Sequence, residues 1–242
     1  MSELRLTACG GVDSSCGAGL DADRDAAARL GVEITTVATA HTVQDEHAVH
    51  GVTAVEPTDW VAQLSATRPT VVKFGLLPGA SHVAAAAAWM QTTQVLAVVD
   101  PVLAASSGHR FLDAVACEVL RIELCAAGPV LTPNLPEAAA LVGESALVGD
   151  DACVVAAERL LEAGARGVVL KGGHGTGPAV RELVLEPGAD PVWIEHPRLP
   201  GSLRGSGCRF ATALALLLAQ GAPLTVAVQG ASALVAGCFP VR

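Results

Sequence analysis

The chain has 242 residues, of which 51% are hydrophobic, 16% are charged and 3% are aromatic. This length suits one large domain or two small ones, and the apolar content excludes a disordered chain. The formal net charge is −9, and Lys and Arg form no run anywhere in the sequence. A partner that is a nucleic acid or an anionic membrane surface is therefore not expected.

Features that would direct the chain to a membrane or an oxidising compartment are missing from the sequence. The longest near-continuous apolar stretch, around Phe210–Ala219, is shorter than the roughly 18 residues that a membrane span needs. The N-terminal MSELRLTACGG has no basic region followed by an apolar run, so we expect no signal peptide. The seven cysteines are scattered and contain no CxxC pair, which favours the reducing cytoplasm over a disulfide framework or a zinc site.

The rarest residue types are informative. Tyr is absent, Asn134 is the single asparagine, and only Lys73 and Lys171 are lysines among the 15 basic residues. A GC-biased genome accounts for this scarcity, and the few survivors then mark positions where substitution is not tolerated. Neither lysine follows a glycine as the P-loop motif requires, so any nucleotide phosphate must be held by another device.

Strand-like apolar runs alternate with helical patterns along the chain, which predicts a parallel sheet covered by helices on both faces. We predict strands at Leu4–Ala8, Glu33–Ala38, Thr70–Phe74, Gln94–Asp100, Pro129–Thr132, Gly167–Lys171, Arg181–Glu186 and Pro191–Glu195. Helices are predicted at Gly19–Leu30, Pro57–Ala66, Ser81–Gln91, Phe111–Ala126, Leu135–Val142, Asp151–Ala163, Gly207–Gln220 and Leu224–Val235. The expected architecture is a single α/β domain over residues 1–242, with a short β-hairpin late in the chain.

The loops that follow the predicted strands are among the most polar and glycine-rich stretches of the sequence. They read CGGVDSSCGAG, TAHTVQDE, GLLPG, DPVLAASSG, TPNLPE and KGGHGTG. Ligands of open α/β sheets bind beyond the carboxyl ends of the strands. The sequence therefore predicts a site built from several of these loops.

One of the candidate motifs is GSGC at Gly205–Cys208, directly before an Ala- and Leu-rich helix. Glycines let backbone N–H groups approach an anion, and the helix N-terminus adds about half a positive charge. Cys208 falls in the first helical turn, where we expect a lowered pKa and a thiolate. The alternative is an ordinary Gly-Ser loop that caps a helix, with the cysteine as a filler.

Two further motifs carry charged groups after strands. In KGGHGTG, the glycines allow close approach to a ligand and Lys171 offers a compact charge for phosphate, although an ordinary glycine turn has the same composition. In TPNLPEA, Asn134 and Glu137 match a helix capping box. The functional alternative is that this pair positions Mg²⁺ or its waters beside a nucleotide.

Asp100 ends a buried strand, where it is either a turn-former or a carboxylate of a metal or phosphate site. Gln44 lies beyond the second strand, where an amide can read a small heterocycle by paired hydrogen bonds, although a plain loop residue is the alternative. GAGLDA at Gly17–Ala22 matches the loose dinucleotide fingerprint only weakly, because the predicted strand ends eight residues earlier, at Ala8. Among the histidines, only His174 lies in a glycine-rich motif.

Taken together, these motifs resemble the hydroxymethylpyrimidine and hydroxymethylpyrimidine-phosphate kinases of thiamine biosynthesis, within the ribokinase-like superfamily. GGVDSSCGAGLDAD is similar to the family's typical AGxDPSGGAGIQAD, and TPNLPEA at Thr132–Ala138 is identical to the family motif. TAHTVQD, KFGLL, DPVLAASSG, LKGGH and RGSGC follow the family's remaining motifs in the same order. The resemblance covers most of the chain.

The resemblance implies a three-layer α/β/α ribokinase-like fold, ATP and Mg²⁺ as cofactors, a small pyrimidine substrate and a homodimer. The reaction it implies is phosphorylation of the hydroxymethyl group of 4-amino-5-hydroxymethyl-2-methylpyrimidine and then of the resulting phosphate. It also implies a catalytic cysteine at Cys208. The other roles that it implies are the anion hole at Gly205, Ser206 and Gly207; substrate binding by Gly11, Asp13, Asp23 and Gln44; ATP binding by Asp100, Asn134 and Lys171; and metal binding by Glu137.

The sequence departs from the family pattern at several positions. Ser106 stands where the family usually has Lys, Arg204 replaces the His before the anion hole, and Cys16 replaces a glycine. These departures leave open whether one or both phosphorylations occur. They also keep two other hypotheses in play: a vitamin B6 kinase acting on pyridoxal, and a non-catalytic pyrimidine-binding regulator with the same fold.

Overall fold

A computed structural model describes residues 4–45, 48–105, 107–173 and 177–239. Within these residues, nine strands form one sheet in the order β3-β2-β1-β4-β5-β6-β7-β8-β9. The pairs from β2 through β1 and β4 to β7 are parallel, whereas β3, β8 and β9 are antiparallel to their neighbours. The strands are β1 (Leu6–Asp13), β2 (Thr35–Gln44), β3 (Val49–Ala54), β4 (Val71–Phe74), β5 (Leu96–Val99), β6 (Val130–Leu131), β7 (Gly167–Leu170), β8 (Ala179–Leu185) and β9 (Val192–Pro197).

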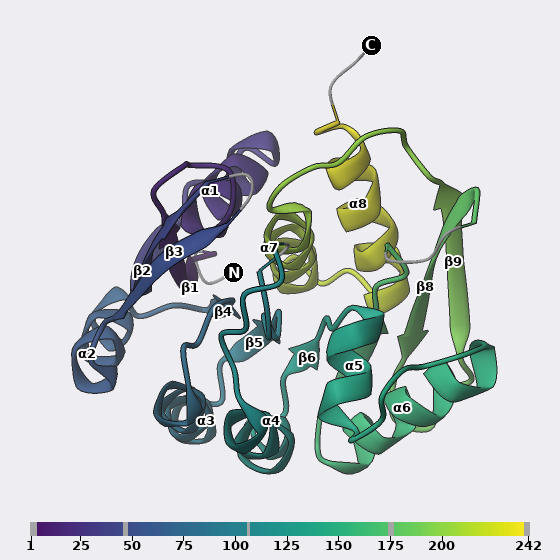
Figure 1. The fold of residues 1–242 in the computed structure, drawn as a ribbon, viewed down its shortest axis with the longest axis horizontal. Helices are drawn as coiled ribbons and strands as arrows, with labels where there is room; N and C mark the ends of the chain where they lie inside the picture. The colour runs from purple at the N-terminus through teal and green to yellow at the C-terminus, as the bar shows by residue number, and fades with distance from the viewer. Residues whose placement is uncertain (1–3, 46–47, 106, 174–176, 240–242) are drawn as a thin grey trace.

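Helices cover both faces of this sheet, as Figure 1 shows. One face carries α1 (Gly19–Arg29), α7 (Ser206–Ala219) and α8 (Leu224–Ala236), and its core includes Leu6, Val98 and Leu214. The other face carries α2 (Pro57–Thr67), α3 (Ala80–Thr93), α4 (Ala114–Val119), α5 (Leu135–Leu141) and α6 (Asp150–Glu162). The predicted three-layer α/β fold with a mostly parallel sheet and a late hairpin, β8–β9, is thereby confirmed.

Four points of the element prediction need correction. The strand predicted at Glu33–Ala38 is β2, which continues to Gln44, so Gln44 ends this strand instead of lying beyond it. The strand β3 was not predicted, because its residues are mostly half-buried or exposed and show no apolar run. The strand β1 continues through Gly10 and Gly11 to Asp13 instead of ending at Ala8, since glycines in a strand interior resemble a loop in the sequence. The loop with Gly17 therefore follows the strand far more closely than the sequence suggested.

The helix predicted at Phe111–Ala126 begins later, at Ala114. The Asp113 side chain caps it by accepting a hydrogen bond from the Ala116 N–H at 2.8 Å. The helix then passes into a π-helical segment, η1 (Leu120–Leu124), before it ends. The remaining predicted helices have their counterparts in the structure, with bounds that differ by one or two residues.

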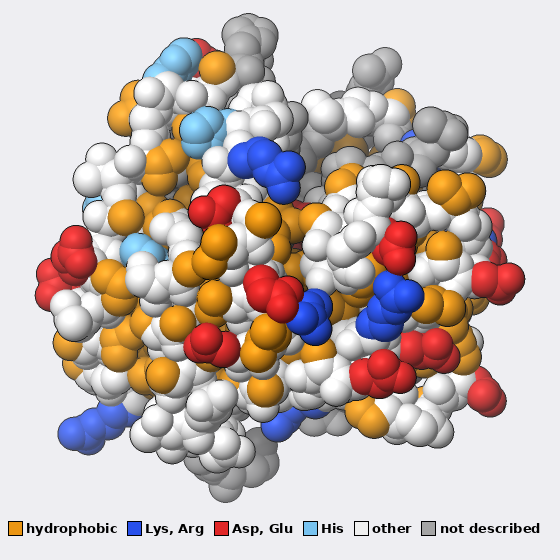
Figure 2. Space-filling view, turned by 60° about the horizontal axis from the view of Figure 1, so that its bottom comes forward, with side chains coloured by type: hydrophobic (Ala, Val, Ile, Leu, Met, Phe, Trp, Pro, Cys, Tyr) orange, Lys and Arg blue, Asp and Glu red, His pale blue; other side chains and the backbone are white. Residues whose placement is uncertain are grey.

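Charged side chains of opposite sign lie next to one another on the face shown in Figure 2. Exposed ion pairs on the surface of the molecule include Arg121–Glu118, Arg159–Glu144 and Arg181–Asp150. Exposed pairs of this kind contribute little to stability, about 0–1 kcal/mol each. Among the helices of the described residues, none is long and apolar enough to cross a membrane.

Candidate active site

A cavity of about 1660 Å³ opens at the carboxyl ends of the parallel strands, where the sequence predicted a ligand site. Each strand delivers a polar residue to it, because the chain turns away from the sheet at these points. The lining includes Asp13 and Gln44, the last residues of β1 and β2, together with Asp100 after β5, Asn134 after β6 and Lys171 after β7. Residues up to 158 positions apart in the sequence thus share one site.

The N-terminus of α7 forms one wall of the cavity, and Gly205, Ser206, Gly207 and Cys208 all line it. Gly205 has φ +69°, and a Cβ there would lie 2.8 Å from the Ala22 Cβ and 2.9 Å from the Gly17 carbonyl oxygen, so only glycine fits. No side chain caps this helix, and its first N–H groups have no intrahelical acceptor. The wall can therefore receive an anion.

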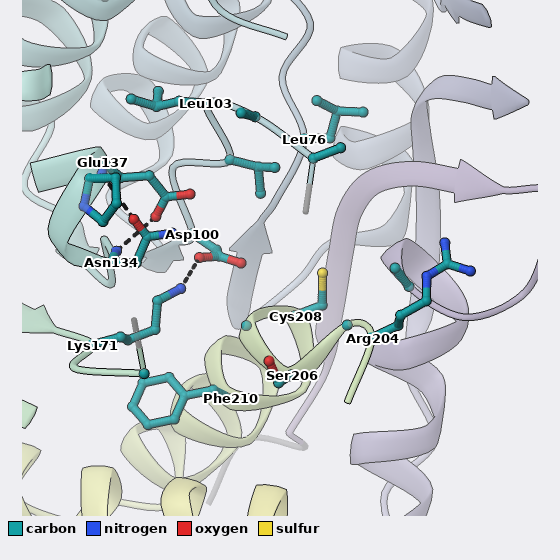
Figure 3. A pocket seen from close by; sticks show the side chains of 18 of the residues that line it. Leu76, Asp100, Leu103, Asn134, Glu137, Lys171, Arg204, Ser206, Cys208 and Phe210 are labelled. Atoms are coloured by element: carbon teal, nitrogen blue, oxygen red, sulfur yellow. Dashed lines mark hydrogen bonds and ion pairs between the residues drawn. The ribbon is translucent and has the colours of Figure 1, made fainter. Parts of the chain in front are cut away.

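The backbone of Gly207 lies against an ion pair between Lys171 and Asp100. The Lys171 Nζ is 2.5 Å from the Asp100 Oδ1, and a Cβ at Gly207 would lie 3.2 Å from the Lys171 Nζ and the Asp100 Oδ2. Figure 3 shows this pair beside the α7 N-terminus. The two carboxylates Asp100 and Glu137 raise the pKa of Lys171 despite its burial, which keeps the ammonium charged. A phosphate at this wall would meet both backbone N–H groups and a fixed cation.

Asn134 and Glu137 form the predicted capping box at the start of α5. The Asn134 N–H donates to the Glu137 Oε2 at 2.8 Å, and the Glu137 N–H donates to the Asn134 Oδ1 at 2.9 Å. The backbones of Asn134 and Lys171 also form an isolated parallel β-bridge, in which the Lys171 N–H donates to the Pro133 carbonyl. Burial raises the pKa of Glu137 to about 7, with Lys171 opposing and Asp100 reinforcing the rise. The two residues that cap α5 therefore also form part of the cavity wall.

These residues fit a magnesium ion that is held mainly by its nucleotide. Among the described residues, no three His, Cys, Asp or Glu side chains are grouped so that they could hold an ion alone. Mg²⁺ is usually bound by one or two carboxylates together with substrate phosphates. Glu137 offers one carboxylate on the cavity wall, close to the Lys171 charge.

Asp13 holds the loop between β1 and α1 and does so with both oxygens. It accepts hydrogen bonds from the Ser15 N–H and hydroxyl at 2.9 and 2.7 Å and from the Gly17 and Ala18 N–H groups at 3.2 and 3.0 Å. Arg204 reaches it at 3.1 Å. Burial opposes the charged form, but hydrogen bonds from Ser15 and Gln44 and the Arg204 charge lower the pKa of Asp13. Asp13 thus shapes the loop rather than offering a free carboxylate.

Gly11 and Gly19 bring the backbones of β1 and α1 together at the base of the cavity. Gly19 has φ +60°, and a Cβ there would lie 2.1 Å from the Gly11 carbonyl oxygen. The Gly19 backbone also makes a hydrogen bond to the Cys208 thiol. The N-termini of α1 and α7 therefore converge on this sulfur.

Asp23, which was predicted to bind substrate, does not line the cavity. Its carboxylate is fully buried and accepts hydrogen bonds from the Lys73 Nζ at 2.8 and 3.0 Å and from the Thr212 hydroxyl at 2.8 Å. The helix α1 turns this residue inward, toward β4 and α7. Lys73, for which the sequence indicated no role, is the member of this cluster that reaches the cavity.

The Cys208 thiol does not have the lowered pKa that its position in the first turn of a helix predicted. Burial raises the pKa of Cys208 to about 11, and Asp23 and Asp100 add to the rise while Lys73 and the Gly19 N–H oppose it. Desolvation and two carboxylates outweigh the helix terminus. At neutral pH the group is therefore a thiol and not a thiolate.

Several cavity residues were not found from the sequence. Glu182 on β8 lies one register position beyond the Leu170–Leu183 pair, opposite Lys171, and its carboxylate accepts a hydrogen bond from Ser232 of α8. Arg110 lines another part of the wall. Glu182 belongs to no motif, and only the sheet register could have indicated it, whereas Arg110 follows the DPVLAASSG motif by two residues. Ser106 and His174 lie outside the described residues.

The fold has three layers, with the sheet in the middle. A glycine-rich helix N-terminus and a lysine meet at the carboxyl ends of its strands. This combination defines a phosphotransferase of the ribokinase-like class. The sequence matches the family described as phosphomethylpyrimidine kinase over residues 13–240. The chain belongs to this family.

Named relatives agree with this assignment. The chain is 36% identical over 239 residues to the hydroxymethylpyrimidine/phosphomethylpyrimidine kinase of Rhizobium meliloti, covering 96% of this chain and 89% of that protein. It is also 36% identical over 223 residues to a thiamine biosynthesis bifunctional protein of Geobacter sulfurreducens, covering 90% of this chain but only 45% of that protein. Among solved structures, an ADP complex of Bacillus subtilis pyridoxal kinase has a TM-score of 0.89 at 27% identity, covering 100% of this chain and 95% of the other.

Proposed function

We propose that the chain transfers the γ-phosphoryl group of ATP to 4-amino-5-hydroxymethyl-2-methylpyrimidine, to its monophosphate, or to both. The observation that carries the proposal is the α7 N-terminus beside the Lys171–Asp100 pair. Phosphoryl transfer depends mainly on positioning and on neutralising charge. An anion hole and a buried ammonium facing one cavity supply both.

The donor end of the cavity would hold the phosphates of ATP. Lys171 and the N–H groups of Gly205–Cys208 would meet the oxygens of the transferred group, where charge is greatest in the transition state. Asn134 would hold the loop that carries Lys171, through the bridge between them. Glu137 would hold Mg²⁺, which neutralises the phosphates when it is bound.

The acceptor end lies across Cys208, toward Arg204 in Figure 3. Gln44 lines this end and would hold the pyrimidine edge, with the Gly11 backbone and the Asp13-bound loop beneath it. The acceptor oxygen would attack the γ-phosphorus, the bond to the β–γ bridging oxygen would break, and ADP would leave. Cys208 would orient the acceptor hydroxyl, and late in the step the hydroxyl proton would pass to an oxygen of the transferred phosphoryl group.

Mass spectrometry of the products from the pyrimidine alcohol, ATP and Mg²⁺ tests this proposal. We expect one equivalent of ADP for each phosphoryl group found on the pyrimidine, and a loss of about 100-fold in rate for Cys208→Ala. A mono- or diphosphate product decides which steps occur. Binding of the pyrimidine without any release of ADP would contradict the proposal and favour a non-catalytic regulator.

Pyridoxal is the second candidate acceptor, because the Bacillus subtilis neighbour is named as a pyridoxal kinase. Both candidate acceptors are small heteroaromatic alcohols, so the shape of the cavity alone does not separate them. A comparison of kcat/KM for the two substrates decides between them. A preference for pyridoxal of more than about tenfold would replace the pyrimidine as the proposed acceptor, since tenfold corresponds to about 1.4 kcal/mol of differential binding in the transition state.

The homodimer and the cytoplasmic location remain predictions. Exposed Val115 and Ile122 lie close together in sequence on α4 and η1, and a partner subunit would cover such side chains. Light scattering of the purified chain measures its mass, and a monomer at micromolar concentration would contradict the dimer.

A further inference from the structure

A buried cluster lies directly behind Cys208 and has no part in the proposed transfer. It consists of Lys73 from β4, Asp23 from α1 and Thr212 from α7. Lys73 and Asp23 have side-chain exposures of 1% and 0%. Thr212 follows Cys208 by four residues, so both side chains lie on the same face of α7, one turn apart.

The backbone fixes the position of the Lys73 ammonium. A Cβ at Gly75 would lie 2.7 Å from the Lys73 Nζ, so the nitrogen sits against the turn that ends β4. Two contacts to Asp23, at 2.8 and 3.0 Å, hold it from the other side. Lys73 lines the cavity as Cys208 does, whereas Asp23 lies behind it.

Stability alone does not explain this pair. Replacing a buried ion pair by apolar side chains of similar size is often neutral or even stabilising, because both charges lose their hydration. A fully buried pair beside a cavity is therefore a candidate for a role in that cavity. The thiol that shares the cavity with Lys73 is Cys208, one turn before Thr212 on α7.

We propose that Lys73 is a positioning residue that acts through Cys208: its ammonium, held by Asp23, stabilises negative charge on the sulfur. This role rests on the proposed function, in which Cys208 orients the acceptor hydroxyl. As the hydroxyl proton moves to an oxygen of the transferred phosphoryl group, the Cys208 thiol would donate a hydrogen bond to the acceptor oxygen. The Lys73 ammonium would stabilise the partial negative charge that this sharing of the thiol proton leaves on the sulfur. Asp23 keeps the ammonium charged and in place.

The other charged groups that face the thiol do not supply this cation. Asp100 after β5 and Asp23 on α1 are negative and oppose charge on the sulfur. Lys171 after β7 is committed to Asp100 at 2.5 Å and to the donor end of the cavity. The N–H of Gly19 on α1 contributes a dipole, and Lys73 contributes the largest favourable charge.

Alkylation of Cys208 by iodoacetamide, followed peptide by peptide with mass spectrometry, tests the role without any turnover. Only the thiolate reacts, so below its pKa the rate falls about tenfold for each unit by which the pKa rises. We expect Lys73→Met to slow alkylation of Cys208 about tenfold at a fixed alkaline pH. Lys73→Met/Asp23→Asn, which leaves no unpaired buried charge, is expected to slow it by a smaller factor, because the loss of the Asp23 charge favours the thiolate while the loss of the larger Lys73 contribution disfavours it.

The direction of the change separates this role from a structural one. Loosened packing would expose the thiol and speed its alkylation in both variants, and that outcome or an unchanged rate would overturn the proposal. Arg181→Met removes a cation from an exposed pair far from α7 and serves as the matched control, with an expected rate equal to that of the wild type. If alkylation slows but no ADP forms with any acceptor, the proposed function fails and the role of Lys73 stands.

Discussion

The two lysines of the chain make the same kind of bond in two different settings. Each lies at the end of a parallel strand and pairs with an aspartate from another element, Lys73 with Asp23 and Lys171 with Asp100. The first pair is almost wholly buried, with Lys73 only 1% exposed where it reaches the cavity wall, whereas the side chain of Lys171 is 14% exposed and faces the cavity. The buried pair can act only through its charge. The open pair can exchange its aspartate for an incoming phosphate.

This difference predicts different consequences when either lysine is lost. Removing one partner of a buried pair leaves a charge with no solvent to receive it. Removing one partner of an open pair leaves a charge that water can reach. Stability should therefore depend on Lys73 and catalysis on Lys171.

The largest expected effect is on turnover. Lys171→Met removes the cation at the donor wall, and by analogy with the loss of one transition-state donor we expect kcat to fall about 1000-fold. The free energy of unfolding should fall by about 1 to 2 kcal/mol, less than for Lys73→Met, because Asp100 is only 4% exposed but lines the open cavity. Initial rates of ADP formation and urea unfolding of the same preparation measure both. A loss of stability as large as that of Lys73→Met would contradict the proposed difference between the two ion pairs.

The next effect is on folding. Lys73→Met should lower the free energy of unfolding by about 3 kcal/mol, because Asp23 is left buried without its partner. Adding Asp23→Leu removes that charge, and most of the stability should return. Urea unfolding followed by circular dichroism measures the two variants side by side. If Lys73→Met alone were as stable as the wild type, the Asp23 carboxylate would not be left buried without a partner. That result would contradict the difference between the two pairs.

The smallest effect concerns a third pair, Asp13–Arg204, which is intermediate because the Arg204 side chain is 33% exposed. The pKa of Asp13 lies below its ordinary value of 3.8, so the folded state binds this proton at a lower pH than the unfolded chain does. Its contribution is present above about pH 4 and disappears as the pH falls further.

Asp13→Asn should therefore cost about 1 kcal/mol near neutral pH and progressively less below pH 4. Unfolding free energies of both proteins across this range give the difference. A difference that stays constant down to acid pH would mean that the hydrogen bonds, and not the charge, hold the loop.

Much of the fold follows from local sequence signals. The buried strand at Val71–Phe74 and the helix that begins at Ser206 were predicted to within one residue, because an apolar run and a glycine boundary mark them. The capping box at Asn134 and Glu137 was also read correctly. The strand β3 escaped detection because an edge strand with few buried residues carries no period-2 pattern.

The site was predictable as a set of loops but not as a set of contacts. The rarity of lysine marked Lys73 and Lys171, yet their partners lie 50 and 71 residues away in the sequence. The position of Cys208 in a first helical turn predicted a thiolate, whereas its pKa is set by burial and by Asp23 and Asp100. Desolvation is a property of the folded chain and leaves no local pattern.

The distribution of aromatic residues has a practical consequence. Without tyrosine, the near-ultraviolet emission of the chain comes almost wholly from its three tryptophans. Trp60 and Trp89 flank Phe74 in the core, Trp193 lies beneath Arg181, and in the described part of the chain none of the three lines the cavity. Intrinsic fluorescence will thus follow unfolding and stay silent when ligands bind. A tryptophan introduced at Phe210, which does line the cavity, would give the site an optical signal of its own.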